Sequence, residues 1–158
     1  MFVGGGAMGH KQGTESLSFD GALDFDIGVG TSPDGIVIVG GLFRVTPIFS
    51  QGADLGLAAR VAMRGFQDGT FGLALDLGGY GRAWGVGSVG FDGALTLGAP
   101  LGLQLTGHVM VGTNDTFGVG AVAGIDILRL TVYRQTLLDW WPNPLPAQQT
   151  TRDSARLW

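Results

Sequence analysis

Apolar and polar residues alternate with a period of two along most of this chain. The clearest segment is 17–29, where Leu17, Phe19 and Leu23 fall on one face and Asp20, Asp24 and Asp26 on the other. A period of two predicts a strand with two different faces, whereas a helix would repeat every 3.6 residues. Similar alternation occurs in 55–66, 71–84, 87–98 and 102–112, and less cleanly in 35–49 and 117–133.

Compact connections rich in Gly, Pro, Asn and Asp separate these segments, as in hairpins. Because the connections are short, neighbouring strands are expected to be antiparallel. With a short first strand in FVGGGAM, the sequence predicts an all-β fold of eight strands. Their expected ranges are 2–8, 16–30, 35–48, 54–66, 70–84, 87–98, 102–112 and 117–133.

The composition changes what such a sheet is expected to contact. Lys11 is the only lysine and Glu15 the only glutamate, while glycine occurs 30 times. The net charge of −4 and the lack of a basic stretch argue against a nucleic-acid partner. Cysteine is absent, which excludes disulfides and thiolate metal sites. We expect no cofactor and no bound metal.

Two interpretations fit the alternation. In a soluble sheet, the Leu/Phe/Val face would be the core and the Asp/Arg face would contact water. In a membrane barrel, the Leu/Phe/Val face would contact lipid and the Asp/Arg face would line the interior. The polar face combines charged residues with Gly and Ala rather than Lys, Glu and Gln. Small residues beside charges suit the crowded interior of an eight-stranded barrel, so the second interpretation is favoured.

The expected pairing supports a buried charge network, because buried charges must be paired. Arg44 is expected near Asp20 and Asp24, and Arg60 near Asp76. Arg82 is expected diagonal to Asp92, and Asp126 near Gln104 and His108. The predicted interior network comprises Asp20, Asp24, Asp26, Arg44, Arg60, Arg64, Asp76, Arg82, Asp92, His108 and Asp126.

The segments LSFDGALDFDIGVG, LGLAARVAMRGF and FGLALDLGGYGRAW give the chain a resemblance to the small eight-stranded outer-membrane barrels of Gram-negative bacteria, the OmpA/OmpX-like group. The resemblance is one of pattern and covers about residues 2–133. It implies an up-and-down transmembrane barrel in the bacterial outer membrane, in contact with its lipid. The chain departs from the group in its short loops and in the 25 residues that follow Tyr133.

The ends of the chain are treated separately. The first residues lack the basic segment and apolar core of a secretory signal, so an exported protein would need a signal that this sequence does not carry. We divide the chain into a barrel, 1–133, and an extended Pro/Trp-containing tail, 134–158. Trp140 and Trp141, beside prolines, are the candidate contact with a protein partner.

The predicted role is structural or interactive, in a barrel whose interior is plugged by Asp/Arg pairs; we do not expect an enzyme or an open porin. One alternative is a soluble or self-assembling β-protein, such as a sandwich or a filament subunit. Another is a lipid-modifying barrel enzyme. Ser88, His108 and Asp92 provide the residue types of a hydrolytic triad, but no nucleophile motif surrounds Ser88. His10 is expected on the surface, in a loop.

Overall fold

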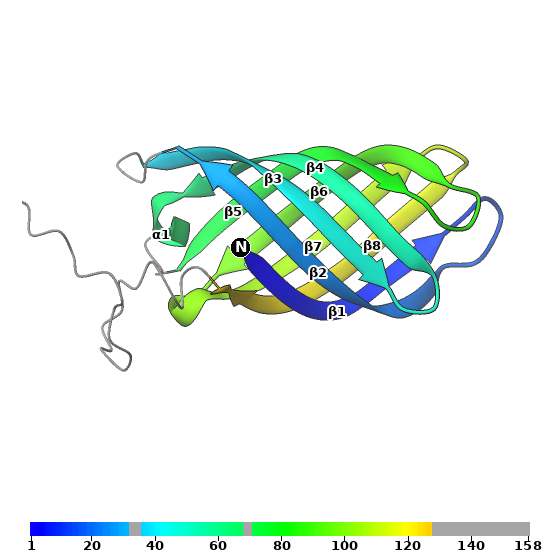
Figure 1. Ribbon diagram of the computed structural model, residues 1–158, viewed down its shortest axis with the longest axis horizontal. Helices are drawn as coiled ribbons and strands as arrows, with labels where there is room; N and C mark the ends of the chain where they lie inside the picture. Colours follow the sequence, from blue (N-terminus) through cyan, green and yellow to red (C-terminus); the bar gives the residue numbers. More distant parts are fainter. Residues whose placement is uncertain (32–35, 68–70, 128–158) are drawn as a thin grey trace, which may run out of the picture.

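A computed structural model of the chain describes residues 1–31, 36–67 and 71–127, which form a closed barrel of eight antiparallel strands (Figure 1). Each strand pairs with the next, and β1 pairs with β8 to close the wall. The strands are β1 (Phe2–Lys11), β2 (Ser18–Gly30), β3 (Val37–Ile48), β4 (Gly52–Met63), β5 (Gly72–Arg82), β6 (Ser88–Gly98), β7 (Leu103–Gly112) and β8 (Thr116–Asp126).

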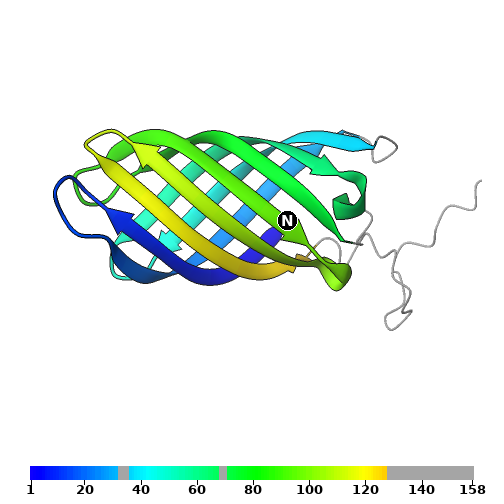
Figure 2. The ribbon, with the colours of Figure 1, turned by 180° about the vertical axis from the view of Figure 1, so that it is seen from behind.

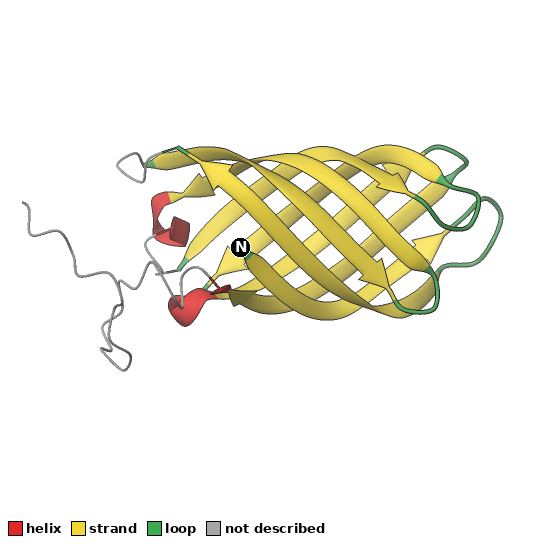
Figure 3. Cartoon of the chain, viewed as in Figure 1, coloured by secondary structure: helices red, strands yellow, loops and turns green. Residues whose placement is uncertain are grey.

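The two ends of the barrel differ. We call the end that holds the N-terminus the terminal end. It also carries the short helix α1 (Arg64–Gln67) and the 3₁₀ turn η1 (Pro100–Gly102) (Figure 3). The opposite, far end carries the connections 12–17, 49–51, 83–87 and 113–115, which have no helix. Within the described ranges, no helix is long and apolar enough to cross a membrane.

Side chains alternate between the inside and the outside of the wall along most of the strands from β2 to β8. The strands slant around the barrel axis (Figure 2). In β7, for example, Leu105 and Val109 are exposed while Thr106 and His108 are buried. The less regular β3 follows the same rule, because Leu42, Arg44 and Thr46 all lie inside. The outer face of the barrel is therefore apolar, and its core is a mixture of charged, polar and small apolar groups.

Several strand ends differ from the sequence prediction. β1 extends to Lys11, so His10 lies in a strand and is buried rather than in a surface loop. β4 begins at Gly52 and ends at Met63. The chain then leaves the sheet in α1, where Phe66 packs against Ala62 and Ala74 and covers part of the terminal end. β8 ends at Asp126; residues 128–133, expected in the same strand, lie outside the described residues.

Glycine makes room inside the wall for larger side chains. A Cβ added at Gly112 would lie 2.4 Å from both Ser88 Oγ and Tyr80 Oη, and one at Gly120 would overlap Met8. Met8 and Tyr80 belong to an apolar layer inside the far half of the barrel, with Ala22, Ile48 and Met110. Glycine at these two positions thus follows from the narrowness of an eight-stranded interior.

Candidate functional site

A buried network of charged groups centres on Arg44. Arg44 lies directly opposite Asp26 in the β2–β3 register and binds it through two nitrogens of the guanidinium group. Nε donates to Oδ1 at 2.8 Å and Nη2 donates to Oδ2 at 2.9 Å. This two-point geometry is the strongest arrangement available to a carboxylate and a guanidinium.

Arg44 also reaches across the lumen to other strands. Its Nη2 donates to Asp76 Oδ2 at 3.0 Å and its Nη1 to Asp92 Oδ2 at 3.1 Å. Asp24 Oδ2 lies 3.5 Å from Nε. One guanidinium therefore links β3 to β2, β5 and β6. Its contacts with β5 and β6, which are not neighbours of β3, cross the inside of the barrel.

Arg60 is the second cation of the network. It lies directly opposite Asp76 on β5, with Nε 2.6 Å from Oδ1 and Nη2 2.7 Å from Oδ2. The expected Arg60–Asp76 pair is therefore present. The Arg60 side chain is 20% exposed, whereas that of Arg44 is 2% exposed. Arg44 is the more completely desolvated of the two.

His108 completes this network between two carboxylates. Its Nε2 lies 3.4 Å from Asp24 Oδ2 and its Nδ1 lies 4.0 Å from Asp92 Oδ1. These carboxylate oxygens and His108 Nε2 are buried and lack a hydrogen-bond partner in the structure. Four aspartates thus surround two arginines and one histidine. With all four carboxylates ionised, the formal charge of the network is negative whichever protonation state His108 adopts.

Arg82 belongs to a second cluster, nearer the far end, and its expected pairing with Asp92 is wrong. Arg82 lies opposite Asp54 on β4 and binds both oxygens of that carboxylate, with Nη2 2.7 Å from Oδ2. Its guanidinium carbon lies 4.4 Å from the centre of the Trp84 ring, and Trp84 Nε1 donates to Asp54 Oδ1 at 2.9 Å. Asp54 was missed because the alternating segment that the sequence shows begins at 55, so Asp54 was not counted among the inward charges.

Three other members of the predicted network lie elsewhere. Asp20 does not reach Arg44; it lies at the far end, 3.7 Å from His10 Nδ1, because Asp26 and not Asp20 is opposite Arg44. Asp126 lies beside the N-terminal amine, 3.3 Å away, at the terminal end rather than near His108. Arg64 is exposed in α1, beyond the end of β4.

Ser88 is not part of a triad with His108. Its hydroxyl contacts Tyr80, Thr116 and Thr113 near the far end. The residue opposite His108 is Ala94, six positions along β6 and thus about 20 Å from Ser88. In the ranges that the structure describes, no three His, Cys, Asp or Glu side chains are placed to hold a metal ion. Trp140 and Trp141 lie outside the described residues.

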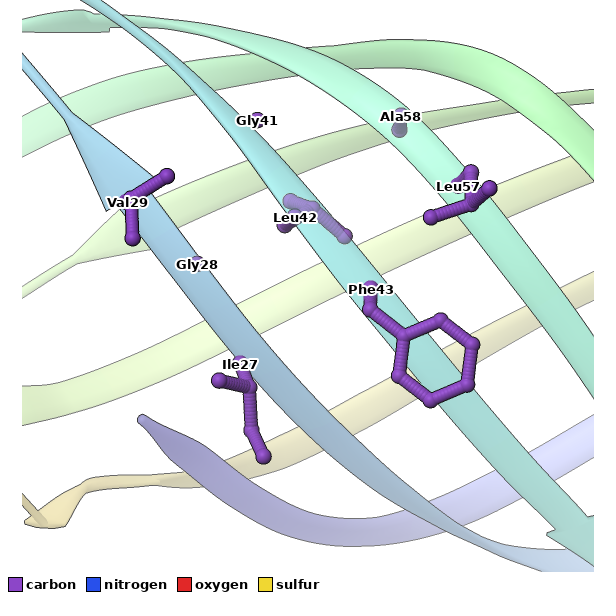
Figure 4. Close-up of a pocket in the computed structure, with 8 residues that line it drawn as sticks. All are labelled: Ile27, Gly28, Val29, Gly41, Leu42, Phe43, Leu57 and Ala58. Carbon is purple, nitrogen blue, oxygen red and sulfur yellow. The ribbon is translucent and has the colours of Figure 1, made fainter.

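The outside of the wall carries a shallow groove, of about 420 Å³, across β2, β3 and β4 (Figure 4). The side chains of Ile27, Val29, Phe43 and Leu57 surround it, above the backbone of Gly28 and Gly41. Its walls are made of hydrocarbon and have no titratable side chain. The groove suits an apolar chain and offers nothing to a polar ligand.

No protein-family model, no curated protein and no solved structure matches this chain. The comparisons therefore assign it to no family.

Proposed function

We propose that this protein spans a bacterial outer membrane as an eight-stranded barrel, in the manner of the OmpA/OmpX-like group. Its role there is structural or interactive, and its interior is closed to transport. The observation that carries the proposal is the reversal of the usual burial pattern. Charged residues fill the inside of the barrel, and large apolar residues cover the outside.

The reversal of the usual burial pattern is large for individual residues. Val29, Phe71 and Leu57 are 82%, 77% and 68% exposed, whereas Arg44 is 1% exposed and Asp24 and Asp76 are 0% exposed. Soluble monomers rarely expose a continuous apolar patch of more than roughly 300–600 Å². Here exposed Leu, Val, Ile, Phe and Met side chains occur on all the strands from β2 to β8. A lipid environment removes the cost of this surface.

The height of the apolar belt supports the same conclusion. On β4 the outward side chains from Leu55 to Met63 are all Leu, Ala, Val or Met. Eight residue steps cover about 26 Å along a strand, and a tilt of about 40° reduces this to about 20 Å along the barrel axis. When the length of the side chains at both ends of this segment is added, the height of the apolar belt approaches the roughly 25 Å that membrane barrels present to lipid.

The contents of the lumen argue for a closed barrel. The network around Arg44 occupies the middle, and the apolar layer of Met8, Ile48 and Met110 lies beyond it toward the far end. Next comes the cluster of Arg82, Asp54 and Trp84. An eight-stranded wall leaves space for its own side chains and little more. A stable aqueous path would have to displace buried ion pairs.

The direct test is the medium in which the chain folds. Refolding into detergent micelles or lipid vesicles should give a compact form that resists SDS until heated, so that unboiled and boiled samples migrate differently. The same chain diluted into buffer alone should aggregate. A monodisperse monomer with a cooperative melt in detergent-free buffer would favour the soluble alternative and overturn the proposal.

A further inference from the structure

Three side chains at the far end lie together and take no part in the central network. His10 on β1 is directly opposite Ser18 on β2, and Asp20 follows two residues later on the same face of β2. Ser18 Oγ lies 3.0 Å from His10 Nε2. Asp20 Oδ2 lies 3.7 Å from His10 Nδ1. The order hydroxyl, imidazole, carboxylate is that of a hydrolytic triad.

The carboxylate determines the role of each ring nitrogen. An aspartate facing Nδ1 favours the tautomer that carries its proton there, which leaves Nε2 to accept the Ser18 O–H. At 3.7 Å the Asp20–His10 contact is longer than a hydrogen bond, and Nδ1 has no closer partner in the structure. Such contacts often tighten only when substrate binds. Gln51 Nε2 donates to the same oxygen at 3.4 Å and holds the carboxylate near the imidazole.

The His10 imidazole packs against Trp84, which belongs to the cluster of Arg82, Asp54 and Trp84. The Trp84 ring meets His10 edge-on, with ring centres 5.0 Å apart and planes at 88°. Trp84 is itself fixed by Asp54 and Arg82. His10 is 7% exposed, whereas Ser18 is exposed. The base is therefore shielded and oriented, while the hydroxyl remains accessible to a substrate, as nucleophilic catalysis requires.

We propose that Ser18, His10 and Asp20 form a site that hydrolyses carboxylic esters. Ser18 Oγ attacks the ester carbonyl carbon as His10 Nε2 takes the hydroxyl proton. The C–O bond to the alcohol then breaks, and His10 returns the proton to the departing oxygen, which leaves an acyl group on Ser18. Water attacks this acyl group by the same route and releases the acid. Asp20 is a positioning residue that stabilises the imidazolium.

The surroundings indicate the substrate class. Leu17, at the end of the connection before β2, and Phe19, on the outer wall, flank Ser18 and are 40% and 65% exposed. An aliphatic acyl chain can lie along these side chains while its ester reaches the rim. One of the alternatives raised by the sequence was a lipid-modifying barrel enzyme. The site proposed for such an activity is Ser18 and not Ser88. The site needs only the folded barrel, so it does not depend on the proposed membrane function.

The test uses the full chain in the medium in which it folds, with folding checked by the heat-dependent gel shift. A fluorophosphonate probe should label the wild type and the control Ser16→Ala, but not Ser18→Ala. Hydrolysis of p-nitrophenyl esters should fall at least about 100-fold in Ser18→Ala and in His10→Gln. Asp20→Asn should lower kcat with little change in KM. Ser18→Ala alters an exposed group and leaves the packing of His10 on Trp84 intact.

Comparison of p-nitrophenyl butyrate with p-nitrophenyl palmitate identifies the source of the ester. Preference for palmitate indicates a lipid substrate, and preference for butyrate a small soluble ester; either supports the site. Folded wild-type protein that neither takes up the probe nor exceeds Ser18→Ala in hydrolysis would overturn the proposal. Labelling without turnover of either ester would also overturn it.

Discussion

The most informative perturbation of the interior is removal of the Arg44 charge. Arg44→Met keeps much of the side-chain volume but leaves four buried carboxylates with Arg60 as the one remaining guanidinium in their network. Asp26 and Asp76 keep contacts with Arg60, at 3.5 Å and 2.6 Å. Among the charged groups that the structure describes, Asp92 keeps only His108, at 4.0 Å. With His108 neutral, the formal charge of the network changes from −2 to −3.

The expected cost follows from this loss of compensation. Removing one partner of a buried ion pair costs about 3–5 kcal/mol, because the other charge remains desolvated. We expect Arg44→Met to reach at least the upper part of this range, since Arg44 contacts four carboxylates. That is a large share of the roughly 5–15 kcal/mol by which proteins are stable. Many molecules of the variant should therefore fail to complete the barrel.

The assay is equilibrium urea unfolding in lipid vesicles, with the folded fraction read from the heat-dependent gel shift. Arg64→Met is the matched control, because it removes the same charge from an exposed position in α1. It should change the free energy of unfolding by less than about 1 kcal/mol. An Arg44→Met variant whose free energy of unfolding is within about 1 kcal/mol of the wild type would contradict this expectation. It would mean that the carboxylates around Arg44 are hydrated.

Arg60→Met should cost less than Arg44→Met, about 1–3 kcal/mol in the same assay, because Arg60 is partly exposed and Asp76 keeps its 3.0 Å bond to Arg44; equal costs would contradict this ranking. Leu57→Arg places a charge on the outer wall and should destabilise the barrel in vesicles by about 2–4 kcal/mol. In a soluble protein the same change at a 68% exposed leucine would be neutral. Purified protein in planar bilayers should show no stable single-channel steps, and steady conductance from a monomer would contradict the closed lumen.

Local patterns in the sequence were sufficient for the strands but not for all of their contacts. Alternation predicts seven of the eight strands, because the inside and the outside of the wall impose a period of two, and a short glycine-rich first strand completes the set. Each observed strand lies within or close to its predicted range. Arg60 and Asp76 could be paired from the sequence because they lie on consecutive strands, inside segments whose alternation is clear. These predictions depend only on neighbouring strands.

The remaining contacts depend on the register of each strand pair and on how the barrel closes. Asp54 lies just before the alternating segment 55–66, so its pairing with Arg82 was not predicted. His10 was placed in a loop, and no local pattern brings it opposite Ser18. The contacts of Arg44 with Asp76 and Asp92 cross the lumen between strands that are not neighbours. Such contacts follow from the way the wall closes, which alternation alone does not specify.

Site-directed spin labelling in vesicles measures directly whether the apolar outer wall contacts lipid. The chain has no native cysteine, so single cysteines can be introduced without other changes. Labels at Leu73, Leu75 and Leu77, which point outward from β5, should collide readily with dissolved oxygen and poorly with a water-soluble nickel complex. A label at the buried Ala74 should collide poorly with both. High accessibility of the three outward positions to the nickel complex would show that the wall faces water and would contradict the account.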